Sequence, residues 1–258
     1  MIHIGHYFDT HRDVKNLSGA NMSGIAESPK SIVVMSTLAV KGALVGAIIP
    51  EFQRRTGIAV EMVFDPTTVL KQRIHGGERA DLIVAISSDL DALVSSGVLS
   101  AEGTRPLVRT GIGIAIHRDA PIFPLRSLEQ LKLALTNAKS VAYSRTGASG
   151  IYFAGLLERL GIAAQVNARA TIIEKGFTGE CVERGQADLA VQQLSELAVV
   201  RGVKIVGPLP AEVQHNTTFS AAVFRSAMRN PNVQRFSEIL SSEFACDAYK
   251  KFGLEIVI

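Results

Sequence analysis

The sequence predicts an α/β protein of two lobes, each a mixed, mostly parallel sheet flanked by helices, with two hinge strands between them. Apolar β-branched runs alternate with helical patterns along most of the chain, which indicates parallel strands covered by helices on both faces. The length of 258 residues exceeds the usual size of one hydrophobic core and favours two lobes. Two strand-like runs, 107–117 and 217–224, interrupt the alternation, and we interpret them as the crossings between lobes.

The first part of the chain predicts three strand–helix units. The expected strands span 31–35, 58–64 and 80–86, and the expected helices begin near Leu38, Asp65 and Ser88. Pro50 lies inside the first helical pattern and should kink it, because proline lacks the N–H that would bond to Gly46. The apolar stretch from Ile32 to Ile49 contains Lys41, so we expect a strand running into a helix rather than a membrane span.

The second part predicts a helix capped by Ser127, a strand at 140–143 and a helix from the N-cap Ser149 to Gly161. Further expected strands lie at 170–173 and 187–193, and further helices at 177–184, after a Ser195 cap, at 231–244 and at 247–252. We therefore divide the chain into an N-terminal extension (1–29), lobe 1 (30–108 and 218–258) and lobe 2 (109–217).

Composition excludes several classes of function. The formal charge is +3 with scattered Lys and Arg and no nucleic-acid module, so no nucleic-acid partner is expected. Trp is absent, which leaves few stacking surfaces. Cys181 and Cys246 lack metal-site spacing and are expected to be unpaired, and His3, His6 and His11 are too irregularly spaced for a metal site. We expect no metal and no cofactor.

Residues 144–153 carry the clearest functional signal. A strand ends there in small hydroxyl residues and a helix begins, so free N–H groups and a helix dipole meet at one point, as an anion site requires. The pairs Ser36-Thr37 and Thr67-Thr68 follow two other strands, where ligands of parallel sheets bind. Simple helix capping explains each junction singly; three together predict a shared anion site that includes Ser149 and Gly150.

Charged residues near these junctions leave alternatives open. Arg73 and Arg145 are candidate charge partners for a carboxylate. The alternative for each is a solvated or ion-paired side chain, and for Arg73 that alternative explains the residue equally well. Gln192 and Gln193 alternate along a strand, so only one should face the cleft, and we favour Gln193. If the protein abstracts a proton, Glu174 and Glu180 are the candidate carboxylates, but no catalytic residue is assigned.

From about Ser31 to Gly253 the sequence resembles the type II periplasmic solute-binding proteins, nearest to the molybdate-binding proteins of ABC importers. The motifs that carry the resemblance are Ser36-Thr37; Thr67-Thr68 with Gln72-Arg73-Ile74, Gly76-Gly77-Glu78 and Ala80-Asp81; Ala148-Ser149-Gly150; and Glu183-Arg184-Gly185-Gln186-Ala187-Asp188 before Gln192-Gln193. The resemblance implies two hinged lobes, an oxyanion held by hydroxyls and backbone N–H groups, and an ABC permease as partner of a monomer.

By this resemblance, Ser36 and Thr67 correspond to hydroxyl ligands, and backbone N–H groups at Ser149 and near Lys175 correspond to the remaining contacts. Gln193 stands where the molybdate binders carry a tyrosine, and an amide serves a carboxylate as readily as a metal oxyanion. The sequence also resembles a branch of the same fold that contains an aconitate isomerase, which implies a tricarboxylate substrate and a proton shift.

The first reading is thus a binding protein for a molybdate-like oxyanion or an organic di- or tricarboxylate, linked to ABC transport. The alternative is an isomerase acting on an aconitate-like tricarboxylate, and a ligand sensor is a third option. The family is usually periplasmic, but residues 1–28 lack the apolar core of a signal peptide, so the chain as written is expected in the cytoplasm.

Overall fold

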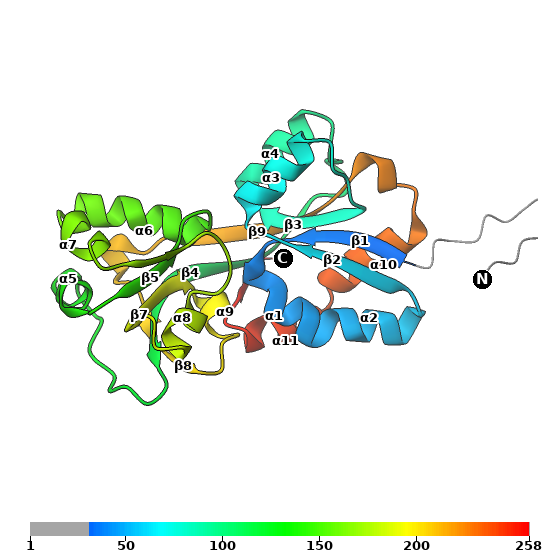
Figure 1. Ribbon diagram of the computed structural model, residues 1–258. Helices are drawn as coiled ribbons and strands as arrows, with labels where there is room; N and C mark the ends of the chain where they lie inside the picture. The colour runs from blue at the N-terminus through cyan, green and yellow to red at the C-terminus, as the bar shows by residue number, and fades with distance from the viewer. Residues whose placement is uncertain (1–30, 258) are drawn as a thin grey trace, which may run out of the picture.

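The computed structural model describes residues 31–257, which form two α/β lobes (Figure 1). The strands are β1 (Ser31–Ser36), β2 (Ala59–Phe64), β3 (Leu82–Ile86), β4 (Arg105–His117), β5 (Val141–Ser144), β6 (Thr171–Ile173), β7 (Leu189–Gln193), β8 (Val203–Pro208), β9 (Asn216–Val223) and β10 (Glu255–Ile256). They follow the order β2-β1-β3-β9-β4-β7-β5-β6, with β8 and β10 both pairing with β4. The predicted α/β class is confirmed.

The helices connect these strands and cover their faces (Figure 1). They are η1 (Leu38–Val40), α1 (Lys41–Ala43), η2 (Leu44–Ile48), α2 (Ile49–Thr56), α3 (Thr67–His75), α4 (Ser87–Ser95), α5 (Leu128–Asn137), α6 (Ala148–Arg159), α7 (Ala163–Asn167), α8 (Gly179–Glu183), α9 (Leu194–Leu197), η3 (Ala211–Val213), η4 (Arg225–Ala227), α10 (Pro231–Leu240) and α11 (Glu243–Lys251). Among residues 31–257, none of these helices is both long and apolar enough to cross a bilayer.

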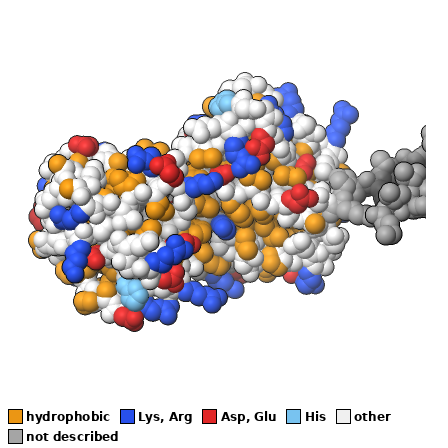
Figure 2. Space-filling view, viewed as in Figure 1, with side chains coloured by type: hydrophobic (Ala, Val, Ile, Leu, Met, Phe, Trp, Pro, Cys, Tyr) orange, Lys and Arg blue, Asp and Glu red, His pale blue; other side chains and the backbone are white. Residues whose placement is uncertain are grey.

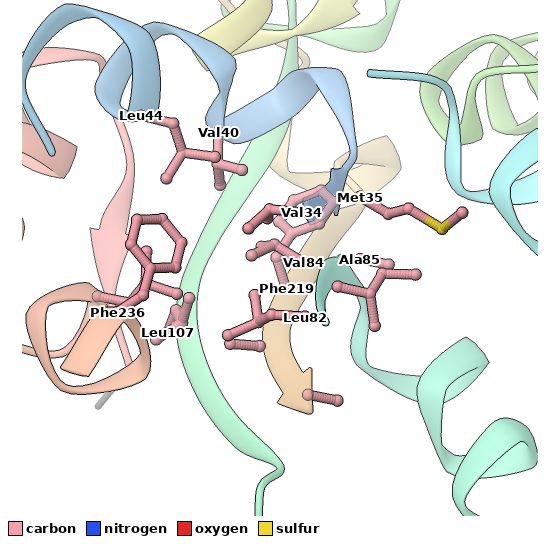
Figure 3. Close-up of a cluster of buried hydrophobic side chains, with 14 of the residues drawn as sticks. Val34, Met35, Val40, Leu44, Leu82, Val84, Ala85, Leu107, Phe219 and Phe236 are labelled. Atoms are coloured by element: carbon pink, nitrogen blue, oxygen red, sulfur yellow. The ribbon is translucent and has the colours of Figure 1, made fainter. Parts of the chain in front are cut away.

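The core of lobe 1 draws on residues 32–108 and 219–254. β1 pairs in parallel with β2 and β3, and β3 pairs antiparallel with β9. Because helices lie on both sides of this sheet, successive side chains such as Val34 and Met35 are both buried (Figure 3). Phe236 of α10 meets the Phe52 ring of α2 edge-on at 5.0 Å, which joins the C-terminal helices to the first half of the chain.

Lobe 2 has a separate core that draws on residues 112–209. Strand β5 pairs in parallel with β6 and β7, and β7 pairs antiparallel with β4. Large side chains on one face of this sheet pack against α5, α6 and α7, whereas Ala115, Ala142 and Ala190 on the other face pack against α8 and α9. The small residues allow these two short helices to approach the strands closely, which fixes the start of α9 at the carboxyl end of β7.

Strands β4 and β9 connect the lobes, as the sequence predicts. Residues 105–111 of β4 pair with β9, and residues 112–117 pair with β7 and β8 of the second lobe. One continuous strand therefore belongs to both sheets. Acidic and basic side chains are interspersed over both lobes on the face shown in Figure 2, in keeping with the small net charge.

Two local expectations are wrong in detail, and the predicted disturbance at Pro50 takes the form of a π-helical segment. Regular α-helical bonding is interrupted in η2, directly before Pro50, where Ile49 N–H bonds to the Leu44 carbonyl five residues back. Ser149 lies one residue inside α6, whose N-cap is Gly147. Ser195 likewise lies inside α9, whose N-cap is Gln193.

The expected unpaired cysteines are found. Cys181 is buried in lobe 2 and Cys246 is partly buried in α11, and both are free thiols. The histidines at positions 3, 6 and 11, and the N-terminal extension as a whole, lie outside the described residues.

Candidate anion site

A small cavity lies where the two lobes meet beside the hinge strands. Its volume is ≈ 30 Å³. The residues that line it are Thr37, Leu38, Ala39, Pro66, Thr67, Thr68, Ile86, Ser144, Gly147, Ala148, Ser149, Gly176, Gln192, Gln193, Glu196 and Phe219. Since a cavity needs about 10–15 Å³ to hold one ordered water, this space admits a compact guest of a few atoms.

Lobe 1 contributes the starts of η1 and α3. Thr67 is the first residue of α3, it is 4% exposed, and its Oγ1 accepts a hydrogen bond from Ile86 N–H at 3.4 Å, which leaves its O–H as a donor. The first-turn N–H groups of Thr67 and Thr68 have no intrahelical acceptor. Thr37 lies on the cavity wall, whereas Ser36 is fully buried and its hydroxyl donates to the Thr37 carbonyl at 3.0 Å.

Lobe 2 contributes the start of α6. Gly147 N–H donates to Ser144 Oγ at 2.9 Å, and the N–H groups of Ala148 and Ser149 begin the helix beside the cavity. Gly150 does not line the cavity, but a Cβ built on it would lie 1.8 Å from the Ser144 carbonyl oxygen. A residue without a side chain is therefore required where the helix packs against the end of β5.

Both glutamines line the cavity, although strand alternation predicted only one. The alternation ends at Gln193 because the chain turns there into α9. The Gln192 amide donates to the Gly176 carbonyl and its oxygen accepts from Thr178 N–H, each at 2.8 Å. The Gln193 amide lies 3.0 Å from Thr217 Oγ1 of β9. Gln192 thus holds the loop at Gly176, which lines the cavity next to the backbone contact predicted near Lys175. Gln193 connects the site to the hinge strand β9.

Glu196 is a site residue that the sequence analysis missed. It is 7% exposed, lines the cavity and occupies the first turn of α9. Burial raises the pKa of the Glu196 carboxyl to about 8, against the lowering effect of hydrogen bonds from the Gln193 backbone and the Gln192 side chain. The signal was the spacing Gln193-Leu194-Ser195-Glu196, because a glutamate three residues after an N-cap turns back toward the cap.

The carboxylates considered from sequence lie elsewhere. The Glu174 side chain is 71% exposed and accepts from Arg145 Nε at 2.8 Å. Glu180 pairs with Arg184 at 2.8 Å on the surface of α8. Neither residue lines the cavity.

The basic side chains near the site are paired with protein groups. Arg73 lies 2.7 Å from both Asp65 and Glu78, and Arg145 pairs with Glu174. No Lys or Arg is among the residues that line the cavity within the described chain. Any anion there would be held by uncharged donors.

Direct contacts join the lobes around the cavity. Thr68 Oγ1 donates to the Thr146 carbonyl at 2.7 Å, and Lys175 forms an ion pair with Asp65. Burial acts to raise the pKa of Asp65, but hydrogen bonds from Lys175 and Arg73 outweigh it and hold that pKa below its usual range. Asp65 is therefore ionised at neutral pH and can anchor lobe 2 through Lys175.

A larger hollow of ≈ 560 Å³ lies on lobe 2. It is lined mainly by apolar residues, among them Phe123, Leu133 and Leu189, with Asp188 at its edge. It lacks the converging hydroxyls and helix starts of the inter-lobe cavity. We therefore take the smaller cavity as the candidate site.

Comparison with known proteins gives two curated relatives. An aconitate isomerase from Pseudomonas sp is 29% identical over 238 residues, which cover 90% of each chain. The molybdate-binding protein ModA of Escherichia coli (strain K12) is 22% identical over 221 residues, covering 81% of this chain and 83% of that protein. Both similarities therefore extend over most of the two lobes.

Solved structures share the fold. The periplasmic molybdate-binding protein of Azotobacter vinelandii superposes with a TM-score of 0.71 at 18% identity, covering 88% of this chain and 99% of that one. The sulfate-binding protein SubI of Mycobacterium tuberculosis H37Rv gives a TM-score of 0.66 at 15% identity, covering 88% and 87%. The family model for bacterial extracellular solute-binding proteins matches residues 32–255, and the chain belongs to that family.

Proposed function

We propose that this protein binds a small anion between its two lobes and presents the closed, liganded form to an ABC-type permease. The observation that carries the proposal is the cavity, where hydroxyls and first-turn N–H groups of α3 and α6 converge from opposite lobes. Helix starts combine unpaired N–H donors with the positive end of the helix dipole, which stabilises an anion. Several such donors offset the cost of removing the anion from water.

Among anions, the cavity favours a compact oxyanion of the molybdate or sulfate type. Its ≈ 30 Å³ suits a guest of a few atoms better than an extended tricarboxylate, which would have to hold the lobes further apart. The absence of a lining cation among the described residues also suits an oxyanion held by neutral groups. The similarity to a molybdate-binding relative supports the same ligand class.

A second candidate function is a proton shift on an aconitate-like tricarboxylate. The relative with 29% identity is an aconitate isomerase, and Glu196 supplies a carboxyl group on the cavity wall that can hold and release a proton. Proton NMR of cis-aconitate incubated with a high protein concentration tests this candidate. No conversion would remove it for that substrate.

Calorimetric titration with molybdate, sulfate, citrate and cis-aconitate tests the main proposal. We expect saturable one-to-one binding of an oxyanion, with weaker or no binding of the tricarboxylates. Tight binding of only a tricarboxylate would overturn the oxyanion assignment, and binding of none of the four would contradict this anion-binding proposal.

Thr67→Val tests the hydroxyl donors. The substitution keeps the branched shape but removes the O–H, so we expect affinity for the bound oxyanion to fall about tenfold to a hundredfold, the effect of roughly 1.5–3 kcal/mol for a hydrogen bond to a charged group. Thr67→Ser retains the hydroxyl and is the matched control. Equal affinities of the two variants would show that the Thr67 hydroxyl does not contact the ligand.

Lys175→Met tests the contribution of the cross-lobe ion pair to closure. Asp65 would lose its partner from lobe 2, and we expect affinity to fall about two- to fivefold, corresponding to roughly 0.5–1 kcal/mol for a pair that is partly exposed. Arg145→Met breaks an exposed pair within lobe 2 and should leave affinity unchanged. Titration of both variants checks the difference, and a larger loss in Arg145→Met would contradict it.

A further inference from the structure

Glu196 is the one ionisable residue that lines the inter-lobe cavity within the described chain. The other polar lining groups are hydroxyls, amides and backbone, and their partners are known for the two glutamines. Gln192 bonds to Gly176 and Thr178, Gln193 bonds to Thr217, and the Gln192 side chain and the Gln193 backbone also donate to the Glu196 carboxyl. The wall of the site therefore carries a carboxyl group with no lining cation to neutralise it.

We propose that the anion occupies this cavity together with one proton, which is shared between the Glu196 carboxyl and an oxygen of the ligand. The inference rests on the proposed function and adds to it the protonation state that the site selects. With a fully ionised oxyanion, Glu196 is the acid and donates its O–H to the ligand. With a ligand that carries an acidic hydrogen, Glu196 is the carboxylate and accepts it. Both descriptions hold the same total of one proton.

Without that proton, the cavity would hold an ionised Glu196 carboxylate beside a negatively charged ligand, which is electrostatically unfavourable. A carboxylate and a dianion in one small cavity would repel each other where little water is present to screen them. Lys175 and Arg73 are committed to Asp65, and Lys41 lies 5.0 Å from the ring centre of Phe64. Because no cation lines the cavity among the described residues, a proton is the available positive charge.

The elements packed against α9 are β4, β7, β8, η1 and α1. Strand β7 and helix η1 carry no ionisable side chains. The charged or titratable residues on the other three are Lys41, Arg105, Arg109, His117 and Lys204. None of them lines the cavity. Arg109 pairs with Glu255 at 2.6 Å, and His117 lies 3.6 Å from Asp119.

The acidity of Glu196 suits this role. Burial raises its pKa to about 8, so at neutral pH the empty site already holds the proton. A dianion that requires the protonated form should bind with constant affinity below about pH 8 and lose about tenfold in affinity for each pH unit above it. Below about pH 8, where Glu196 is already protonated, binding takes up no proton. Above about pH 8, each bound anion takes up one proton.

The test is calorimetric titration of the whole protein with sulfate and molybdate between about pH 6 and about pH 9.5, each in two buffers of different ionisation enthalpy. We expect a level dissociation constant at the acid end and proton uptake that approaches one per bound anion at the alkaline end. The inference would be overturned if the dissociation constant did not change with pH and the heat of binding did not depend on the buffer.

Glu196→Gln supplies an independent readout. The amide cannot ionise, so the dissociation constant of this variant, whatever its level, should stay within about twofold across the same range, and buffer-dependent heat should vanish. A variant that retained the wild-type pH profile would also overturn the inference, because the proton would belong to another group. The wild-type proton uptake decides the question if the variant does not fold.

The two proposals fail differently. If neither anion binds wild-type protein at any pH, the oxyanion proposal is lost and the proton with it. If an anion binds with an affinity independent of pH, the oxyanion proposal stands and only the shared proton is lost.

Discussion

Gly150→Ala should destabilise lobe 2 and abolish anion binding. The new Cβ would lie 1.8 Å from the Ser144 carbonyl oxygen, and that atom is backbone at the end of β5, so no side chain can rotate away. We expect a loss of roughly 3 kcal/mol or more in the free energy of unfolding, with the start of α6 displaced from the cavity. Denaturant unfolding and titration of the variant measure both effects.

Gly155→Ala is the matched control in the same helix. There the nearest atom to the added Cβ is the flexible end of Arg159 at 3.4 Å, so alanine should fit and stabilise α6 by about 0.5–1 kcal/mol. Equal destabilisation by both substitutions would mean that α6 does not tolerate alanine in general and that the close approach at Gly150 has no special role.

Glu196→Gln should make the empty protein more stable at alkaline pH. In the unfolded chain the carboxyl ionises near its ordinary pKa of 4.5, whereas burial in the fold raises that pKa to about 8. The raised pKa gives a contribution that is full below the unfolded value and is lost as pH rises toward the folded value. Wild type should therefore lose on the order of 4 kcal/mol relative to the variant between these two pH values, at about 1.4 kcal/mol for each pH unit.

Denaturant unfolding of both proteins across this range measures the difference. All other titrating groups are common to the two chains, so the difference curve reports Glu196. It should be steepest between its two pKa values and level above about pH 8. A flat difference curve would mean that the fold does not hold Glu196 as a buried acid.

Sequence patterns predicted helices and strands well where an apolar pattern is followed by a residue, such as glycine, that ends the element. The run at 31–35 became β1 because apolar β-branched residues suit a strand covered on both faces, and Gly57 ended α2 in a left-handed conformation (φ 69°). Short elements were harder. α7 follows Gly161 after only one intervening residue and has no cap signal, so it was missed.

The site was predicted in outline and not in detail. Hydroxyl residues at strand ends located Thr37, Thr67 and Ser149 on the cavity, because the carboxyl ends of neighbouring strands meet at one edge. Pairing between residues distant in sequence could not be predicted, and it decides the state of Lys175, whose partner Asp65 lies in the other lobe. The spacing of Glu196 after Gln193 indicates a side chain that turns back toward the start of α9, but its burial against the cavity depends on how α9 packs, and the sequence alone does not give that packing.

A crystal structure of the protein with its tightest-binding anion tests the central claim most directly. We predict the anion between the lobes, within hydrogen-bonding distance of the Thr67 hydroxyl and the first N–H groups of α3 and α6, with no Lys or Arg side chain in contact. An anion bound outside this cavity, or held there mainly by cationic side chains, would contradict the account.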